Sequence, residues 1–509
     1  MRTITYQQPT QGIDPFYLFL HVQSIVGDGN AFLLEAGRSD DSDLYQMSII
    51  GVCPTVEIQI KDGLVSVFAR GEAAKLFREM PDRILDTAGL EEKVWPSSVS
   101  SAPMLFRPSD PMAFLETTRI MLRDAFSPGL TQPFSAGFLG YMGYDAVHYL
   151  EKLPKTTSDD RNVPDVRLQW HRGVIHIVND AVTLYIQDTG SSSEGQSDVF
   201  SELIHTLENA SEHGLAQPSV LQSYNEDASR RPSVHYDVTE DIYCDNVKRA
   251  KEYIRQGDIF QVVLSTRIRI DNALHPYVAY DRLRQLNPSP YMFVAEYEGM
   301  RIYGASPEVQ FRSTHGHAEM KPIAGTSRGR GLSREEDEAL VKALKSDEKE
   351  SAEHVMLVDL CRNDLGRVAK TSTVRVPDFM VVERYSHLYH LVSRVVAQLQ
   401  DDVSVFHALL ATFPNGTLSG APKIRAMEII DELETVRRGP YGGFIGMIDA
   451  DANANTAIVI RTVVEIGGTQ YVQVGAGIVL DSVPEREWQE CHHKAGAILD
   501  VLTGERVTN

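Results

Sequence analysis

Two acidic pairs carry the residue types and the spacing that most clearly indicate chemistry. Glu350 and Glu353 lie three residues apart in the stretch 347–367, which is predicted to be a helix. Both carboxylates should therefore project from the same face of that helix. Glu487 and Glu490 repeat this spacing in a second predicted helix near the C-terminus. Carboxylates from two helices can surround a hard divalent cation, and a cation there can hold an anionic substrate. The pairs therefore predict a Mg²⁺-dependent enzyme that acts on a small carboxylate.

A structural interpretation of these acids has to be weighed beside the metal site. Asp347 and Glu350 have the spacing of a capping box, and acidic residues are common in the first turn of a helix. Capping does not account for Glu353 or Glu490, which lie further along their helices. Carboxylates at the edge of a buried stripe are costly unless they are paired or bind a metal. Metal binding and solvated or ion-paired acids both remain open on the spacing alone.

Two glycine-rich runs and two isolated polar residues are further candidates, each with a plain structural alternative. Residues 415–428 form a loop that enters a helix and could receive an anion, although they do not match the phosphate-loop pattern. Residues 473–480 contain glycines that let a ligand approach the backbone. Arg461 is a single charge in an apolar strand and needs a structural or a substrate carboxylate. His390 lies between apolar residues, where a core histidine is the commoner outcome.

These residues must be positioned by a mixed set of helices and strands. Thr239 and Gly257 predict the two caps of one helix. Strand-like runs rich in β-branched and aromatic residues occur throughout, often as adjacent pairs. This mixed order favours an α+β fold with largely antiparallel sheets over a doubly wound parallel sheet. Further helices are predicted at 334–346, 347–368, 403–411, 422–436 and 485–502.

A polar stretch rich in glycine and serine is the best candidate for a boundary within the chain. We predict a linker-like segment at 188–235, which separates an N-terminal region at 1–187 from a region at 236–509 that contains both acidic pairs. No internal repeat of useful length is visible.

Composition excludes several classes of protein. The chain has 509 residues and a formal net charge of -21, which argues against non-specific binding to nucleic acids or to anionic membranes. None of the four cysteines belongs to a CxxC motif, which indicates reduced thiols. No apolar run approaches the ~20 residues of a membrane-spanning helix. We therefore expect a soluble, cytoplasmic protein.

Considered together, the motifs of this chain resemble the chorismate-utilising enzymes, and most closely the anthranilate synthase component I family. The resemblance covers nearly the whole chain and is densest from 239 to 502. The motifs that carry it are PIAGTSRGRG, SAEHVMLVDLCRNDLGR, ERYSHLYHLVSRV, FPNGTLSGAPKIRAMEIIDELE, YGGFIGMID and GAGIVLDSVPEREWQECHHKA.

This resemblance implies both a fold and an activity. The implied fold is α+β, with large antiparallel β-sheets packed in a sandwich and flanked by helices. The implied activity is that of an anthranilate synthase large subunit, which converts chorismate and ammonia to anthranilate and pyruvate with Mg²⁺, in tryptophan biosynthesis or a related pathway. A separate glutamine amidotransferase subunit would supply the ammonia.

The resemblance also implies roles for individual residues. Glu353 and Glu490 would bind Mg²⁺ directly and Glu350 and Glu487 through water, so that the ion holds the ring carboxylate of chorismate. Glu308 would protonate the departing C4 hydroxyl. The pyruvyl carboxylate would be met by Tyr441, Arg461, Gly475, Ala476 and Gly477, and the pocket would be completed by Gly325, Thr326, Thr417 and Lys494.

Three positions refine the reaction within this family. Relatives that add water at C2 carry a lysine base where this chain has Gln261, so ammonia is the expected nucleophile. Ala324 replaces the lysine of the aminodeoxychorismate synthases, which indicates amination at C2. His390 is retained and would assist the elimination of pyruvate. A 2-amino-2-deoxyisochorismate synthase that lacks this elimination is the alternative, and a non-catalytic subunit is disfavoured because the charged residues are intact.

Regulation by tryptophan is the point at which the chain departs from the family pattern. The family's inhibitor site combines an LLES motif with NPSPYMF, and this chain has Glu35 but Ala36 in place of the serine. A lost hydrogen bond costs about 1 kcal/mol on average. We therefore predict weakened or absent inhibition. The remaining residues of this predicted site are Asn287, Pro288, Ser289, Pro290, Tyr291 and Met292.

Overall fold

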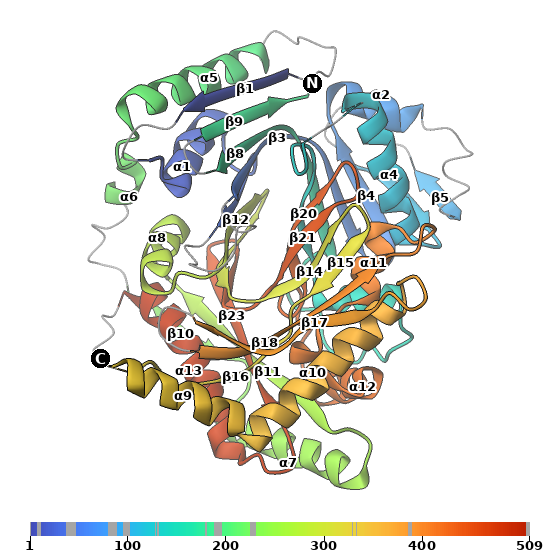
Figure 1. The fold of residues 1–509 in the computed structure, drawn as a ribbon. Coiled ribbons are helices and arrows are strands. Elements are labelled where there is room, and N and C mark those ends of the chain that lie inside the picture. The colour runs from blue at the N-terminus through green and yellow to red at the C-terminus, as the bar shows by residue number, and fades with distance from the viewer. Residues whose placement is uncertain are drawn as a thin grey trace.

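The computed structural model shows strands paired side by side in the interior and helices around them (Figure 1). Neighbouring strands in the described part of the chain pair in antiparallel fashion, as the mixed order of elements predicts. The structure describes residues 2–7, 12–36, 47–79, 89–94, 102–127, 129, 132–178, 181–187, 196–223, 231–327, 329–331, 333–384 and 389–504.

Two long strands join the halves of the sheet. Strand β3 (Met47–Lys61) pairs with β8 (Val166–Val178) along most of its length. Beyond this pair the sheet continues in two directions, from β3 to β2 (Ala31–Ala36) and from β8 to β7 (Gly137–Met142). The strands on either side form two arms of one continuous sheet.

Each arm contributes strands from distant parts of the sequence. The first arm continues from β2 through β12 (Tyr291–Tyr297), β13 (Met300–Ser306), β22 (Thr462–Ile466), β23 (Thr469–Ile478) and β11 (Gln261–Asp271), which also pairs with β10 (Ser233–Tyr236) and β19 (Gly420–Ala421). The second arm continues from β7 through β20 (Phe444–Asp449), β21 (Ala454–Ile458), β14 (Val309–Thr314), β15 (His317–Met320) and β18 (Tyr389–Gln398), beside which lie β16 (Ile323–Thr326) and β17 (Arg375–Arg384). The edges are extended by β1 (Arg2–Gln7) and β9 (Ala181–Ile186), and by β4 (Leu64–Ala69), β5 (Leu90–Val94) and β6 (Met104–Pro108).

Apolar side chains from both arms meet in a shared core. Phe32 and Phe293 of the first arm belong to the same buried cluster as Tyr141 and Met447 of the second. Strands β7 and β20 are buried at every position, which accounts for their largely apolar sequences. The expected sandwich of antiparallel sheets is confirmed, and the fold class is α+β.

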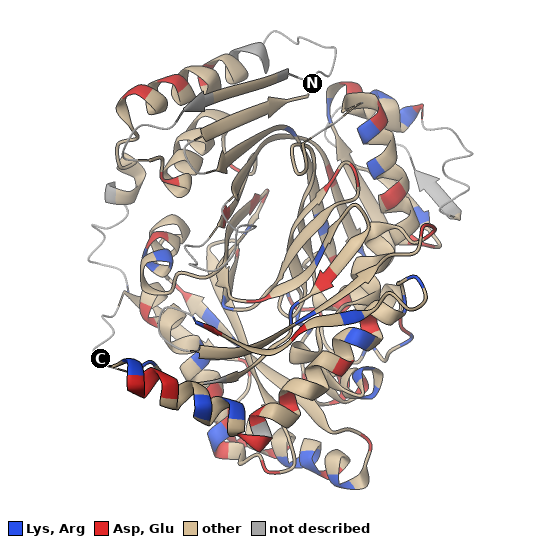
Figure 2. Ribbon diagram, in the orientation of Figure 1, with Lys and Arg blue, Asp and Glu red and all other residues tan. Residues whose placement is uncertain are grey.

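Helices cover the outer faces of the arms, and Figure 2 shows most of the charged residues on these helices rather than on the strands. In the described part of the chain, no helix has the length and apolarity needed to cross a membrane. The helices that position the candidate site are α10 against β16 and β18, α12 against β11, and α13 against β23. The bounds are α1 (Pro15–Val26), α2 (Gly71–Arg78), α4 (Pro111–Phe126), α5 (Gln196–His213), α6 (Ser219–Ser223), α7 (Glu240–Gln256), α8 (Pro276–Leu286), α9 (Arg334–Ser346), α10 (Glu348–Gly366), α11 (Val405–Ala411), α12 (Lys423–Leu433) and α13 (Pro484–Thr503), with 3₁₀ helices η2 (Tyr144–Tyr149) and η3 (Gly416–Leu418).

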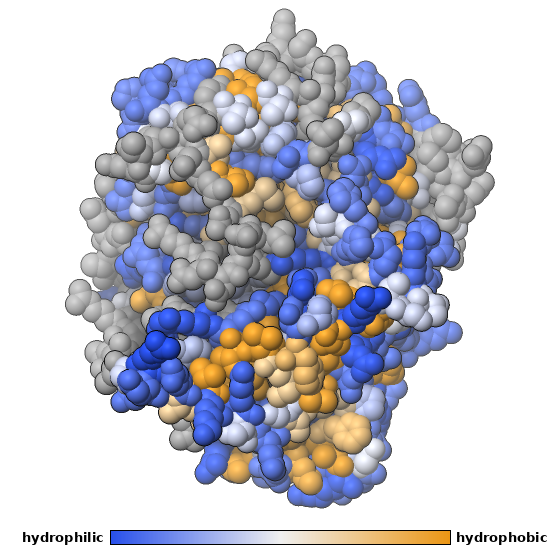
Figure 3. Space-filling view, viewed as in Figure 1, coloured by the Kyte–Doolittle hydropathy of each residue, from blue (hydrophilic) through white to orange (hydrophobic). Residues whose placement is uncertain are grey.

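The outer strand β17 leaves apolar side chains on the surface. Phe379 and Val381 are about half exposed there, at 52% and 45%. Figure 3 shows apolar residues gathered on the face that carries β17, β18, α9 and α10. Strand β17 pairs with β18 along one side, so it lies at the edge of the second arm.

The two regions predicted on either side of the linker-like segment share one sheet. Strand β2 pairs with β12, and β7 pairs with β20, so each arm contains strands from both 1–187 and 236–509. Helices α5 and α6 lie within 188–235. The division of the chain into domains stays a prediction.

Candidate active site

Glu308 lies between β13 and β14 as a nearly inaccessible carboxyl group. Its Oε1 accepts a hydrogen bond from the Thr417 hydroxyl at 3.2 Å, and its backbone carbonyl accepts from Ile458 N at 3.0 Å. Burial raises the pKa of Glu308 to about 8, against the opposing effects of Thr417 and of the Arg461 charge. At neutral pH this carboxyl is mainly protonated, which is the state that a general acid requires.

Arg461 is close to this acid and provides a positive charge without a committed partner. Its backbone is in the left-handed region, with φ 49°, directly before β22. The residue is accessible to solvent, yet enough protein surrounds its guanidinium to lower its pKa by desolvation. Among the described residues it has no ion pair and no side-chain hydrogen bond. A guanidinium in this state is suited to a substrate carboxylate.

His390 of β18 and Glu350 of α10 both lie next to Gly325 of β16. His390 Nδ1 of β18 lies 3.2 Å from the Gly325 carbonyl oxygen, and Thr326 is its register partner on β16. Gly325 has a positive φ of 81°, and a Cβ there would lie 3.3 Å from Glu350 Oε2 of α10. Burial lowers the pKa of His390, and the Arg461 charge acts in the same direction, so the imidazole is neutral at pH 7.

The glycines of β23 form a second part of the site. The Gly475 carbonyl accepts from Lys494 Nζ at 2.8 Å, and a Cβ on Gly475 would lie only 2.9 Å from Tyr441 Oη. A Cβ on Gly477 would lie 2.7 Å from Gln261 Nε2. The run from Gly475 through Ala476 to Gly477 is therefore a narrow backbone cradle that has no room for larger residues.

The short helix η3 joins these two parts. It carries Thr417, the partner of Glu308, and it contacts α10, β19 and β23. Leu418 packs in a small buried cluster with Tyr441 and Ile458. Through η3 the acid Glu308 and the glycine cradle of β23 belong to one region.

The four carboxylates predicted to bind Mg²⁺ lie on the two helices that flank this region. Glu350 of α10 is beside Gly325, whereas Glu490 of α13 forms an ion pair with Lys494 at 2.8 Å. Glu353 and Glu487 lie one helical turn away from them. Oxygen donors fit the chemistry of Mg²⁺. Within the described residues, however, no three His, Cys, Asp or Glu side chains stand close enough to hold a metal, so the ligand set stays a prediction.

The two segments of the predicted tryptophan site are neighbours in the structure. In the pairing of β2 with β12, Glu35 is opposite Met292 and Ala36 is opposite Tyr291. The Glu35 carboxylate accepts from Tyr280 Oη at 2.8 Å and from Arg284 at 2.7 Å. Asn287, which ends α8, precedes the rest of the segment. Tyr280 and Arg284 were not singled out in the sequence, and inhibitor binding itself stays a prediction.

Two ion pairs behind the site were also missed in the sequence. Lys423 donates to Asp364 of α10 at 2.6 Å, so this lysine of the 415–428 loop is engaged by a helix rather than available to an anion. Arg438 and Glu434 form the other pair, with side chains 2% and 7% exposed. The only sequence signal was their four-residue spacing, which is equally typical of exposed pairs.

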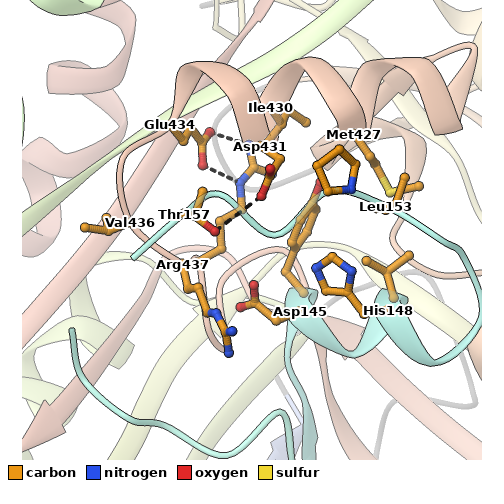
Figure 4. Close-up of a pocket in the computed structure, with 14 residues that line it drawn as sticks. Asp145, His148, Leu153, Thr157, Met427, Ile430, Asp431, Glu434, Val436 and Arg437 are labelled. Atoms are coloured by element: carbon orange, nitrogen blue, oxygen red, sulfur yellow. Dashed lines mark hydrogen bonds and ion pairs between the residues drawn. The ribbon is translucent and has the colours of Figure 1, made fainter. Parts of the chain in front are cut away.

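A small cavity lies next to this second pair, between the end of α12 and η2. Figure 4 shows Asp145 and His148 of η2 facing Asp431 and Glu434 across it. Burial raises the pKa of Asp145 to about 6, and its carboxylate accepts from Gly439 N at 2.8 Å. The volume is about 20 Å³, which is enough for one water molecule and too small for a ring substrate.

Comparison with known proteins places the chain in a family. Residues 106–500 match the family described as chorismate binding enzyme. The chain belongs to this family. Membership agrees with the contacts of Glu308, Arg461 and Gly475, which all lie within the matched residues.

Individual members show how similar the chain is to its relatives. It is 47% identical over 378 residues to anthranilate synthase component 1 of Acetivibrio thermocellus, covering 72% of this chain and 75% of that protein. It is 43% identical over 381 residues to the component 1 of Aquifex aeolicus, covering 72% and 74%. The crystal structure of anthranilate synthase component I from Streptococcus pneumoniae TIGR4 matches with a TM-score of 0.71 and 32% identity, covering 91% of this chain and 94% of that one. The menaquinone-specific isochorismate synthase of Escherichia coli shares the fold, with a TM-score of 0.63 and 16% identity over 98% and 94% of the two chains.

Proposed function

We propose that this chain is the large subunit of an anthranilate synthase, which forms anthranilate and pyruvate from chorismate and ammonia. The relatives named component 1 support this function. The observation that carries it is a protonated carboxyl group, Glu308, near the guanidinium of Arg461, which has no ion pair among the described residues. Together they offer a proton for a leaving hydroxyl and a positive charge for a carboxylate, the two things that chorismate requires.

The residues divide the reaction between two steps. In the first, ammonia forms a bond to C2, the ring double bonds shift, and the C4–O bond breaks while Glu308 gives its proton to the hydroxyl, which leaves as water. In the second, neutral His390 receives the proton that C2 loses, C2 and C3 become doubly bonded, and the C3–O bond breaks to release the enolate of pyruvate, which then takes up a proton. Gln261 beside Gly477 cannot act as a base, which favours ammonia over water as the nucleophile.

The substrate carboxylates would be held at the two parts of the site. Arg461, Tyr441 and the backbone from Gly475 to Gly477 would bind the pyruvyl carboxylate. Mg²⁺, when bound by Glu353 and Glu490 with Glu350 and Glu487 through water, would supply positive charge to the ring carboxylate. This list of ligands follows the family resemblance and the oxygen donors present on α10 and α13.

The source of ammonia gives a first prediction. The component 1 names imply a second component, and we propose a glutamine amidotransferase. The isolated chain should therefore form anthranilate with ammonium salts, increasingly so as raised pH increases the free ammonia, and form none with glutamine. Anthranilate fluorescence measured with each nitrogen source checks this. Activity of the isolated chain with glutamine would contradict a separate amidotransferase.

Inhibition by tryptophan gives a second prediction. Tryptophan should inhibit the enzyme weakly or not at all, because Ala36 lacks the hydroxyl that the family motif provides. Ala36→Ser should increase the sensitivity about fivefold or more, the equivalent of one hydrogen bond. Inhibition curves of both proteins, with the exposed variant Thr5→Ser on β1 as a control, check this. Complete inhibition of the unaltered chain at low micromolar tryptophan would refute it.

The proposed function itself is tested by product analysis. Purified chain, chorismate, Mg²⁺ and ammonium salt should give anthranilate and pyruvate in equal amounts. An aminated product without pyruvate, identified by mass, would instead support the 2-amino-2-deoxyisochorismate synthase.

A further inference from the structure

We propose that the buried ion pair of Glu434 and Arg438 positions the substrate-binding elements of the active site. This inference rests on the proposed function, because it concerns the pocket in which chorismate would bind. Among the described residues, neither Glu434 nor Arg438 forms a hydrogen bond or an ion pair with Glu308 or Arg461. Both are therefore positioning residues, which act through the backbone and the side chains that they hold.

Arg438 connects two site elements through its guanidinium. Its Nη1 donates to the Leu418 carbonyl at 2.7 Å, and its Nη2 donates to the Val263 carbonyl at 2.8 Å. Leu418 follows Thr417, the partner of Glu308, and Val263 is two residues from Gln261 on β11. One side chain thus fixes η3 relative to β11, and so fixes the acid's partner relative to Gln261.

Glu434 holds the arginine and a second point on β11. Its Oε2 accepts from Arg438 Nε at 2.8 Å, while its Oε1 accepts from Ser265 N at 2.8 Å and Ser265 Oγ at 2.9 Å. In the pairing of β11 with β23, Ser265 lies opposite Gly475. The Ser265 hydroxyl also accepts from Gln473 Nε2 at 2.9 Å, which ties it to β23 by a side chain. The carboxylate therefore supports the strand segment behind the glycine cradle.

The guanidinium also supports an aromatic side chain of the pocket. Its Cζ lies 5.7 Å from the ring centroid of Tyr441 and 4.5 Å from that of Tyr144. Tyr441 Oη points to Gly475, where a carboxylate would bind. A planar guanidinium can pack on a ring and donate sideways at the same time, whereas a lysine ammonium cannot. The position consequently requires arginine rather than positive charge alone.

Stability by itself does not account for this arrangement. A buried ion pair often contributes little net stability, because desolvation of the two charges offsets their attraction. Here the Arg438 donors that do not reach Glu434 are directed at the carbonyls of Leu418 on η3 and Val263 on β11, and Oε1 of Glu434 accepts from Ser265 N of β11 as well. The contacts select one relative placement of η3 and β11, and the Gln473–Ser265 hydrogen bond extends this placement to β23 behind the glycine cradle.

The test is a kinetic comparison of two conservative arginine variants. Arg438→Lys should raise KM for chorismate about 10- to 100-fold, the loss expected from hydrogen bonds of a charged group, with a much smaller change in kcat. Arg301→Lys is the matched control, since Arg301 on β13 also pairs with a carboxylate that is 1% exposed, Glu296, at 2.9 Å. Arg301→Lys should lower Tm about as much as Arg438→Lys does, but it should leave KM for chorismate unchanged.

A milder variant keeps the proposal testable if Arg438→Lys does not fold. Ser265→Ala removes one hydrogen bond to Glu434 and the acceptor of Gln473, and should raise KM about three- to tenfold. A folded Arg438→Lys with the KM of the unaltered enzyme, or a Ser265→Ala with that KM, would overturn the positioning role. Failure of the unaltered chain to convert chorismate would instead overturn the proposed function, so the two failures are distinguishable.

Discussion

Replacing Glu308 with glutamine should lower kcat for anthranilate formation by about 10²- to 10⁴-fold, the range expected on removal of a general acid. Glutamine keeps the size of the side chain and can still accept from the Thr417 hydroxyl, but it has no acidic proton to give to the C4 oxygen. KM should change little, because Glu308 would act on the leaving group and not on a carboxylate.

The raised pKa of Glu308 predicts a pH profile that distinguishes a catalytic role from a purely structural one. Its pKa is raised to about 8, so the acid form is present below that pH, and at a fixed concentration of free ammonia kcat/KM for chorismate should fall as the pH rises through it. Glu308→Gln should lose this limb of the profile. The raised pKa means that the folded protein holds this proton more tightly than the unfolded chain does. Between the ordinary pKa of a glutamate and about 8, the contribution of Glu308 to the free energy of unfolding therefore falls as the pH rises. At pH 8 Glu308→Gln should be at least as stable as the unaltered protein.

The control for this experiment is Glu432→Gln, which removes an exposed carboxylate that pairs with Arg249 on the surface. Its activity and pH profile should match those of the unaltered enzyme. A Glu308→Gln protein that keeps more than a tenth of the activity would remove Glu308 from the chemistry.

Replacing Glu353 with glutamine should lower activity at saturating Mg²⁺ by more than about 100-fold, since even groups that only support metal ligands often cost 10- to 100-fold. The amide keeps the shape of the side chain and loses the charge that attracts the cation. The apparent Mg²⁺ affinity, measured by titration of activity and by calorimetry, should fall as well. Far-UV circular dichroism should show that the fold is retained.

Glu348→Gln on the same helix is the matched control, because Glu348 is an exposed residue of the first turn of α10. Its Mg²⁺ dependence should be unchanged. If Glu353→Gln and Glu348→Gln behave alike, the proposed ligand set is wrong, whereas the assignment of Glu308 would stand.

Local signals in the sequence predicted the helices well. Thr239 caps α7 through its hydroxyl, which accepts from Ile242 N, and Gly257 ends it in the left-handed conformation with φ 83°. The helix predicted at 334–346 is found at those bounds, and the one predicted at 485–502 corresponds to α13. Caps and apolar periodicity are properties of neighbouring residues, so they are visible before the chain folds.

Contacts between distant segments were beyond the reach of the sequence. Glu434 and Arg438 have the spacing of a surface pair, and only the arrival of β11 and η3 on either side buries them. In the same way, Tyr280 and Arg284 of α8 bond to Glu35 of β2, although about half of the chain separates these elements in sequence. The roles of the site residues could be predicted only with the family resemblance, because spacing alone left structural alternatives open.

The central claim is that this chain converts chorismate and ammonia to anthranilate and pyruvate. The most direct measurement follows the isolated protein with chorismate, Mg²⁺ and ammonium by mass spectrometry, with Glu308→Gln in parallel. The account predicts equal amounts of anthranilate and pyruvate from the unaltered chain and almost none from the variant. Chorismate that stays intact, or is converted to a product without nitrogen, would contradict it.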